Sequence, residues 1–220
     1  MTNQSSTLDG LYSRAQGAVA YVDESYYSPS HGTGRTFYVI CATIVQQEAR
    51  GSLREGLLSL AGGDFWHTTE AARSSSGRDK LRAMIDLLRV SATSVCWITE
   101  PLSKSDREGE SARAELLRES TKDLIEMHLP ASGLIIYERR RTGYQANADV
   151  RVFTEMRSKS KIDRAFLIHP ESPANEPLLW APDVVAWSYR QSFLGRDASY
   201  FAPLKKQTQV LYLNSKSRLP

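Results

Sequence analysis

The apolar and polar positions of the first fifty residues predict two adjacent strands. Small and β-branched residues over 17–25 indicate a buried strand that ends on two acids, Asp23 and Glu24. The segment 35–45 is almost continuously apolar, which is typical of a central strand covered on both faces. Between these two, 26–34 is rich in Tyr, Ser, Pro and Gly and predicts a hairpin loop.

Farther along the chain, strand patterns alternate with helical patterns. Further strands are expected at 65–67, 94–99, 134–137, 165–168 and 209–213. Helices are expected at 47–61, 77–90, about 104–129, 144–157 and 178–194. A hairpin followed by this alternation predicts an α/β fold with a mixed sheet and helices on both faces. Residues 1–16 are polar and predict a flexible lead-in or a short edge helix before a single domain over 17–220.

Composition narrows the class of protein. The 220 residues are 41% hydrophobic and 24% charged, which is typical of a folded globular domain rather than a disordered chain. No apolar run approaches the roughly 18 residues of a transmembrane helix, and the polar N-terminus does not resemble a secretory signal. Cys41 and Cys96 lie in apolar runs and are too few for a disulfide scaffold, so we expect buried thiols in a cytoplasmic protein.

The charge is unevenly distributed along the chain. Residues 1–138 contain 14 Lys and Arg against 18 Asp and Glu, whereas 139–220 contain 14 against 7. The first part therefore has a balance of −4 and the second a balance of +7. This asymmetry permits a polyanionic partner but does not require one, because exposed basic residues also keep proteins soluble.

Four acids stand where an apolar element begins or ends. Asp23 and Glu24 end the first strand, Glu138 ends a later strand, and Asp183 lies near the start of the last helix. Successive strand residues point to opposite faces, so only one of Asp23 and Glu24 can face a given site, and the pattern leaves that choice open. Converging carboxylates repel one another unless a proton or a cation lies between them, and such oxygen ligands suit Mg²⁺ or Mn²⁺. The alternative is that these acids cap helices or pair with arginines, three of which directly follow Glu138.

Two short motifs resemble those of a known family. The segment 20–25, Ala-Tyr-Val-Asp-Glu-Ser, resembles the opening motif of an uncharacterised bacterial and phage family, a domain of unknown function with a ribonuclease H-like fold. The segment 178–187, Leu-Leu-Trp-Ala-Pro-Asp-Val-Val-Ala-Trp, resembles the start of that family's closing helix, with Asp183 at its acidic position. The expected order of elements agrees over about residues 17–195. The resemblance implies a ribonuclease H-like mixed sheet and a metal-dependent nuclease.

The same resemblance implies a set of metal ligands, because the ribonuclease H-like fold carries acids on its first strand, on a later strand and on its last helix. The matching ligands of Mg²⁺ or Mn²⁺ are Asp23, Glu138 and Asp183, with Glu24 as a candidate fourth. Three positions depart from the family: Tyr26 replaces a glycine, Pro182 replaces an alanine, and Glu138 stands where nucleases of this fold often have Asp. Proline suits the first turn of a helix, whereas the longer Glu138 side chain changes the spacing of the ligands.

The segment 65–73 offers a further candidate for catalysis. It carries His67 and Glu70 between a glycine pair and a serine-rich loop, and family members often have Lys or His near this point. His67 can orient a phosphate or transfer a proton near neutral pH. The alternative is a half-buried His67 beside Trp66 and a Glu70 that stabilises a helix start. The histidines expected to be structural or exposed are His31, His128 and His169.

A basic run follows Glu138. Seven of its residues are candidates for binding a nucleic-acid backbone in a sequence-independent and salt-sensitive way: Arg139, Arg140, Arg141, Arg151, Arg157, Lys159 and Lys161. Tyr144 and Phe153 are aromatic residues that can stack on bases, although a core role is expected for Phe153. The alternative for the whole run is a solvated helix face.

The sequence therefore supports two functions. The first is a metal-dependent nuclease or a related phosphodiesterase in which Asp23, Glu138, Asp183 and His67 take part in catalysis. The second is a binding module for nucleic acid or protein that keeps the fold without turnover. The motifs of serine hydrolases, P-loop NTPases and zinc metalloproteases do not occur in the sequence. DNA and RNA both stay open as substrates, and so does the oligomeric state.

Overall fold

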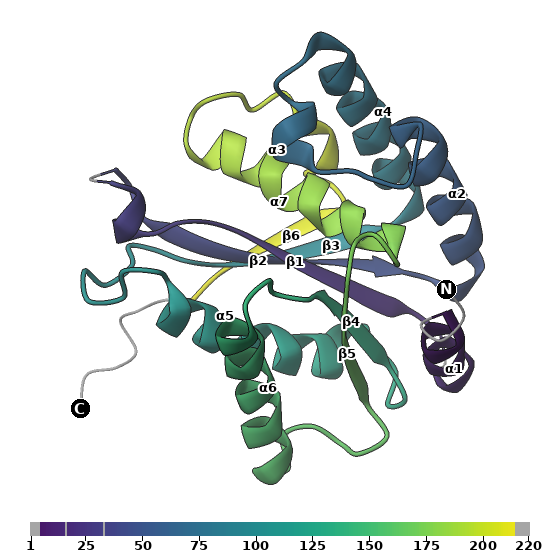
Figure 1. Cartoon of the computed structure of the whole chain (residues 1–220), viewed down its shortest axis with the longest axis vertical. Coiled ribbons are helices and arrows are strands. Elements are labelled where there is room, and N and C mark those ends of the chain that lie inside the picture. The colour runs from purple at the N-terminus through teal and green to yellow at the C-terminus, as the bar shows by residue number, and fades with distance from the viewer. Residues whose placement is uncertain (1–4, 16, 33, 214–220) are drawn as a thin grey trace.

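A six-stranded mixed sheet forms the centre of the protein in a computed structural model that describes residues 5–15, 17–32 and 34–213 (Figure 1). The order across the sheet is β5-β4-β1-β2-β3-β6. The strands are β1 (Val19–Tyr27), β2 (Phe37–Val45), β3 (Thr93–Thr99), β4 (Leu134–Glu138), β5 (Leu167–Glu171) and β6 (Thr208–Tyr212). Neighbours among β1, β2 and β3 are antiparallel, whereas β4 and β5 run parallel to β1, and β6 runs parallel to β3.

Helices cover both faces of this sheet, as Figure 1 shows, and the predicted α/β class is confirmed. The helices on one face are α2 (Arg50–Ala61), α3 (Thr68–Ala71), α4 (Ser75–Ser91) and α7 (Trp180–Phe193). Those on the other face are α5 (Glu110–Asp123) and α6 (Gly143–Ser158). A π-helical turn, Leu124–His128, extends α5, and a 3-10 turn, Pro177–Leu179, leads into α7.

Each face of the sheet has its own hydrophobic core, and the strands contribute to the two cores alternately. From β1, Val19 and Tyr21 pack with α7, α2 and α4, whereas Ala20 and Val22 pack with α5 and α6. In β4, Leu134 and Ile136 lie on the α7 face, whereas Ile135 and Tyr137 lie on the α5 face. This alternation with a period of two determines which face receives the polar residues that end each strand.

The N-terminal segment is more ordered than a flexible lead-in. Ser5–Arg14 form helix α1, which buries Leu8 and Leu11 in the core on the α7 face. For these residues the edge-helix alternative is confirmed and the flexible lead-in is wrong, because two leucines three apart give the segment an apolar face. Residues 1–4 and 16 of the predicted lead-in lie outside the described ranges.

Two of the predicted elements are wrong. Residues 65–67 do not form a strand: Trp66 packs into the core and His67 directly precedes α3. The segment lies over the α7 face, where Trp66 joins the core, and it is not paired with any of the six described strands. The helix expected from about residue 104 begins only at Glu110, because the Asp106 carboxylate accepts hydrogen bonds from the backbone N–H groups of Ser111 and Ala112 and caps the helix there.

The β5 edge of the sheet contains a proline. The Leu167 N–H donates to Gly133, and the Glu171 carbonyl accepts from the Arg139 N–H, so the odd-numbered residues of β5 pair toward β4. Pro170 therefore directs its backbone away from β4, where a missing N–H removes no bond from the sheet. The Arg139 guanidinium donates to the Pro170 carbonyl oxygen at 3.2 Å.

The cysteines lie opposite each other on β2 and β3. Cys41 and Cys96 form a cross-strand pair, and both are buried and free, as predicted. Within the described ranges, none of the helices is both long enough and apolar enough to cross a bilayer.

Candidate functional site

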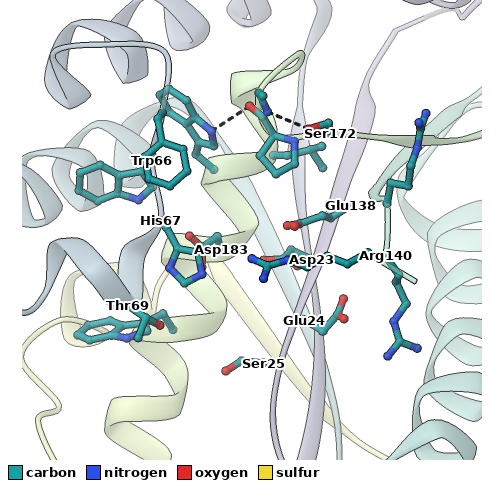
Figure 2. Close-up of a pocket in the computed structure, with 18 of the residues that line it drawn as sticks. Asp23, Glu24, Ser25, Trp66, His67, Thr69, Glu138, Arg140, Ser172 and Asp183 are labelled. Carbon is teal, nitrogen blue, oxygen red and sulfur yellow. Dashed lines mark hydrogen bonds between the residues drawn. The ribbon is translucent and has the colours of Figure 1, made fainter. Parts of the chain in front are cut away.

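Three acids from distant parts of the chain converge on the α7 face. Asp23 continues the alternation of Val19 and Tyr21, so its carboxyl points toward α7, whereas Glu24 points toward α5. Because Val22 lies beside Tyr137 in the register of β1 and β4, the next residues, Asp23 and Glu138, lie beside each other. Asp183 approaches them from the first turn of α7, which packs across β1 (Figure 2). It is therefore Asp23, and not Glu24, that lies on the same face of the sheet as Asp183.

These acids lie in a cleft of about 690 Å³. The cleft runs between the ends of β1 and β4, the segment before α3, and α7. The lining of the cleft contains carboxylates, arginines and aromatic rings. The lining residues used below are Asp23, Glu24, Tyr26, Phe65, Trp66, His67, Glu138, Arg139, Arg140, Arg141, Asp183, Trp187 and Arg190.

Asp183 is held by the segment that precedes α3. Its Oδ2 accepts hydrogen bonds from the Thr68 backbone N–H at 2.9 Å and from the Thr68 hydroxyl at 2.8 Å. The hydroxyl oxygen in turn accepts a bond from the Trp66 indole N–H at 2.9 Å. This chain fixes one oxygen of Asp183 and leaves the other toward the cleft. Sequence reasoning did not identify Thr68, although it directly follows the histidine that was singled out.

The pKa values of the three acids are all raised, by burial first and, for Asp23 and Glu138, by neighbouring carboxylates as well. Burial, and then the charges of Glu138, Glu24 and Asp183, raise the pKa of Asp23 well above its ordinary range. Burial, and then the charges of Glu24 and Asp183, raise the pKa of Glu138 to about 6, which a hydrogen bond with Asp23 offsets in part. Burial also raises the pKa of Asp183, against the hydrogen bonds from Thr68 and the nearby His67. The cleft therefore favours a positive charge or a proton between its acids.

We expect the metal-free protein to lose stability as the pH rises through this range. Folded Glu138 holds its proton up to a pKa of about 6 against 4.5 when unfolded, so folding binds protons between these values. The free energy of unfolding should then fall from pH 4.5 to 6 by up to about 2 kcal/mol from this residue, and raised pKa values at Asp23 and Asp183 act in the same direction. Urea unfolding in EDTA across this range, with Glu138→Gln for comparison, measures the contribution. An identical pH dependence in the two proteins would contradict the expectation.

His67 lies beside Asp183 at the mouth of the cleft (Figure 2). Its Nδ1 is buried and has no hydrogen-bond partner among the described residues. The predicted proximity of His67 to the acids therefore agrees with the structure. Glu70 is exposed on α3 and does not line the cleft, in agreement with the alternative that it stabilises a helix start.

Glu24 belongs to a buried ion network on the opposite face of the sheet. Arg113 on α5, which is 3% exposed, approaches Glu24 at 2.6 Å and makes two hydrogen bonds to Asp149 on α6, at 2.9 and 2.8 Å. The same guanidinium donates to the Tyr38 hydroxyl at 3.2 Å. Glu24 also lines the cleft, but its charge is compensated by Arg113. This pairing makes Glu24 a weaker candidate for a fourth metal ligand than the three acids on the α7 face.

Sequence reasoning missed both Arg113 and Asp149, although the spacing held a signal. Arg113 precedes Leu116 and Leu117 by three and four residues, and Asp149 precedes Val152 and Phe153 in the same way. Each charged residue therefore lies on the apolar face of its helix. Opposite charges at the same position of two buried helix faces indicate an ion pair between the helices.

The basic run divides into two groups. Arg139, Arg140 and Arg141 line the cleft beside Glu138. Arg140 is paired through both guanidinium nitrogens with Glu110, at 2.7 and 2.8 Å. Arg141 is exposed, and no hydrogen-bond or ion-pair partner occurs for it among the described residues.

The remaining four candidates lie away from the cleft, on α6 and just after it. Arg157 donates to the carbonyl oxygens of Asp163 and Phe166, and Lys159 pairs with Glu155 at 2.6 Å. Arg151 lies over the Tyr144 ring, and Lys161 is exposed. These four residues do not line the cleft, because α6 covers the other face of the sheet. Their predicted binding of a nucleic-acid backbone therefore stays a prediction. Phe153 is buried, as predicted, and Tyr144 is exposed.

The acids are not arranged as a ready metal site. Among the residues that the structure describes, no group of three or more His, Cys, Asp and Glu side chains has the arrangement needed to hold a metal ion. One of the two carboxylate oxygens of Asp183, Oδ2, is already bonded to Thr68.

Comparison with known proteins adds no relative. No family model matches the sequence, and no curated protein matches it. The functional interpretation therefore depends on the chemistry of the cleft.

Proposed function

We propose that this protein is a metal-dependent nuclease of ribonuclease H-like type, with Asp23, Glu138 and Asp183 as its catalytic acids. The observation that carries the proposal is the convergence of three carboxylates from β1, β4 and α7 in one cleft, with none of them in an ion pair among the described residues. Burying uncompensated acids together is costly for folding, and such clusters occur where function requires them.

The order of the elements supports this assignment. The acids come from the first strand, from a strand parallel to it and from the last helix. This is the order that the resemblance to the ribonuclease H-like family implies. An antiparallel β1-β2-β3 unit joined to the parallel β4 and β5 agrees with a mixed sheet of that type.

The donor set fits a hard divalent cation. Carboxylate oxygens are the ligands that Mg²⁺ and Mn²⁺ prefer. Burial raises the pKa of all three acids, and neighbouring carboxylates raise those of Asp23 and Glu138 further, so a cation among them would be favoured. When bound, the ion supplies the positive charge that polarises a phosphodiester and activates water for attack at neutral pH. Asp23, Glu138 and Asp183 would hold it.

The surrounding residues of the chain have separate roles. Thr68 fixes one oxygen of Asp183 and so orients the carboxylate. Arg141 offers an exposed cation at the Glu138 side of the cleft, where it attracts the phosphate backbone. His67 lies beside Asp183 in the cleft. From there it would orient a phosphate oxygen or transfer a proton. We further infer that the protein acts in the cytoplasm, where the free buried thiols of Cys41 and Cys96 persist.

Cleavage of nucleic acids tests the proposal directly. Single- and double-stranded DNA and RNA are incubated with Mn²⁺ or Mg²⁺, and the wild type is compared with Asp183→Asn. The asparagine keeps an oxygen for the Thr68 bonds but loses the charge, so we expect cleavage to fall at least about a hundredfold. Asp86→Asn on α4 is the matched control, since its carboxylate is exposed and lies outside the cleft.

Two results would count against a nuclease. Equal cleavage by all three proteins would indicate a contaminating enzyme. Binding of nucleic acid without cleavage by any of them, on all four substrates and with both metals, would favour the non-catalytic module.

A further inference from the structure

Arg190 is a second charged feature of the cleft, separate from the acids and from the basic run. It lies on α7 and lines the cleft together with Asp183 and Trp187, at positions i, i+4 and i+7 of one helix face. Its Nε is buried and has no hydrogen-bond partner among the described residues. Burial and the nearby Arg196 lower its pKa.

A buried guanidinium nitrogen without a partner is costly, because the group has lost its water and gained no acceptor. Two of the other arginines of the cleft have partners, Arg140 with Glu110 and Arg139 with the Pro170 carbonyl, and Arg141 is exposed to solvent. Arg190 lies near Tyr26 and Tyr27 at the end of β1. An incoming anion with several oxygens would supply the missing acceptors, and a planar guanidinium suits phosphate best.

The position of Arg190 distinguishes it from the reacting centre. It lies seven residues after Asp183, a rise of about 10 Å along the helix. His67, whose Nδ1 is the other buried orphan nitrogen of the cleft, lies beside Asp183 (Figure 2). The backbone of Arg190 is therefore about two helical turns away from the residue beside which His67 lies.

We infer that Arg190 binds a second phosphate of the substrate, next to the one that reacts, and that the substrate is therefore a single-stranded oligonucleotide rather than a compound with one phosphate. This inference rests on the proposed function. An exposed aromatic ring of the cleft suits an unpaired strand. Phe65 lines the cleft and is 66% exposed, and exposed rings stack on unpaired bases.

Binding measured without catalysis tests the inference. Fluorescence anisotropy with a labelled strand of ten thymidines, in EDTA, compares the wild type with Arg190→Gln and with Arg196→Gln as the matched control. Arg196 has the same charge and lies close by, but it is exposed and does not line the cleft. We expect Arg190→Gln to weaken binding roughly tenfold and to reduce the slope of log affinity against log salt by about 0.7, the value for one lost phosphate contact. Arg196→Gln should change the slope little.

A further variant tests whether the charge of Arg190 is what matters, and a mononucleotide competitor tests whether one phosphate is enough for binding. Arg190→Lys, which keeps the charge, should recover most of the slope if phosphate binding is the role of the residue, and thermal unfolding shows whether each variant is folded. Thymidine 5′-monophosphate should compete weakly with the ten-residue strand. Equal losses in the Arg190→Gln and Arg196→Gln variants, unchanged binding in both, or equally strong competition by the mononucleotide would overturn the inference. Because the assay needs no cleavage, an inactive protein would refute the nuclease and leave this result standing.

Discussion

Asp23→Asn is expected to stabilise the metal-free protein and to abolish its cleavage activity. Asp23 is buried beside Glu138 and Asp183, and burial and these charges raise its pKa well above the ordinary range. Asparagine has nearly the same shape and removes the charge, so the free energy of unfolding in EDTA should rise by about 0.5 to 2 kcal/mol. For a protein of this size, that is an increase in Tm of about 1 to 8 °C.

The same substitution should remove the response to metal. In the wild type, Mn²⁺ should raise the Tm, because a ligand that binds only the folded state stabilises it. The Asp23→Asn protein should show little of this increase, and cleavage should fall at least about a hundredfold. Asp86→Asn is again the control, with unchanged Tm and unchanged activity. A lower Tm for Asp23→Asn in EDTA would contradict the electrostatic account of the cleft.

Arg113→Met should be the most destabilising of the substitutions considered. Arg113 compensates two acids at once: Glu24, and Asp149, which is 2% exposed. Methionine fills a similar volume but removes the cation that both acids share, and the buried Asp149 cannot compensate by contact with water. Removing one partner from a buried ion pair typically costs about 3 to 5 kcal/mol, and urea unfolding at pH 7 measures the loss.

Arg118→Ala on the same helix is the matched control. Arg118 also pairs with an acid on α6, Glu155 at 2.9 Å, but both side chains are 41% exposed. Exposed pairs contribute little, so this substitution should cost at most about 1 kcal/mol. Adding Asp149→Leu to Arg113→Met should restore part of the stability, since it removes one of the uncompensated charges. Similar losses in the Arg113 and Arg118 variants would show that burial does not set the strength of these pairs.

Sequence patterns predicted most of the sheet and the acids that end its strands. The apolar runs that became β1, β2 and β4 are continuous because helices cover both faces, and such runs are easy to detect. For the same reason they do not show which face is which, so the choice between Asp23 and Glu24 stayed open. That choice depends on which core contains α7, a fact of the tertiary structure.

The remaining errors arise from partners that are distant in sequence. The segment 65–67 has strand-like residues, but none of the described strands pairs with it. It leads directly into Thr68, which binds Asp183, 115 residues later. The basic run looked continuous in sequence, yet helix geometry separates Arg139, Arg140 and Arg141 from the residues of α6. Arg190 was overlooked because a single arginine in an apolar helix gives no pattern without knowledge of what faces it.

The proline in β5 has a consequence for self-association of the protein. An exposed strand normally offers a row of N–H and C=O groups to which a strand of another molecule can add, which is a route to aggregation. At Pro170 the outward N–H is absent, and the outward carbonyl oxygen is already bonded to the Arg139 side chain at 3.2 Å. Neither group is available to an incoming chain. This edge is therefore blocked against strand addition at Pro170. Arg139, which occupies the outward carbonyl oxygen, belongs to the basic run that the sequence pattern linked to nucleic acid.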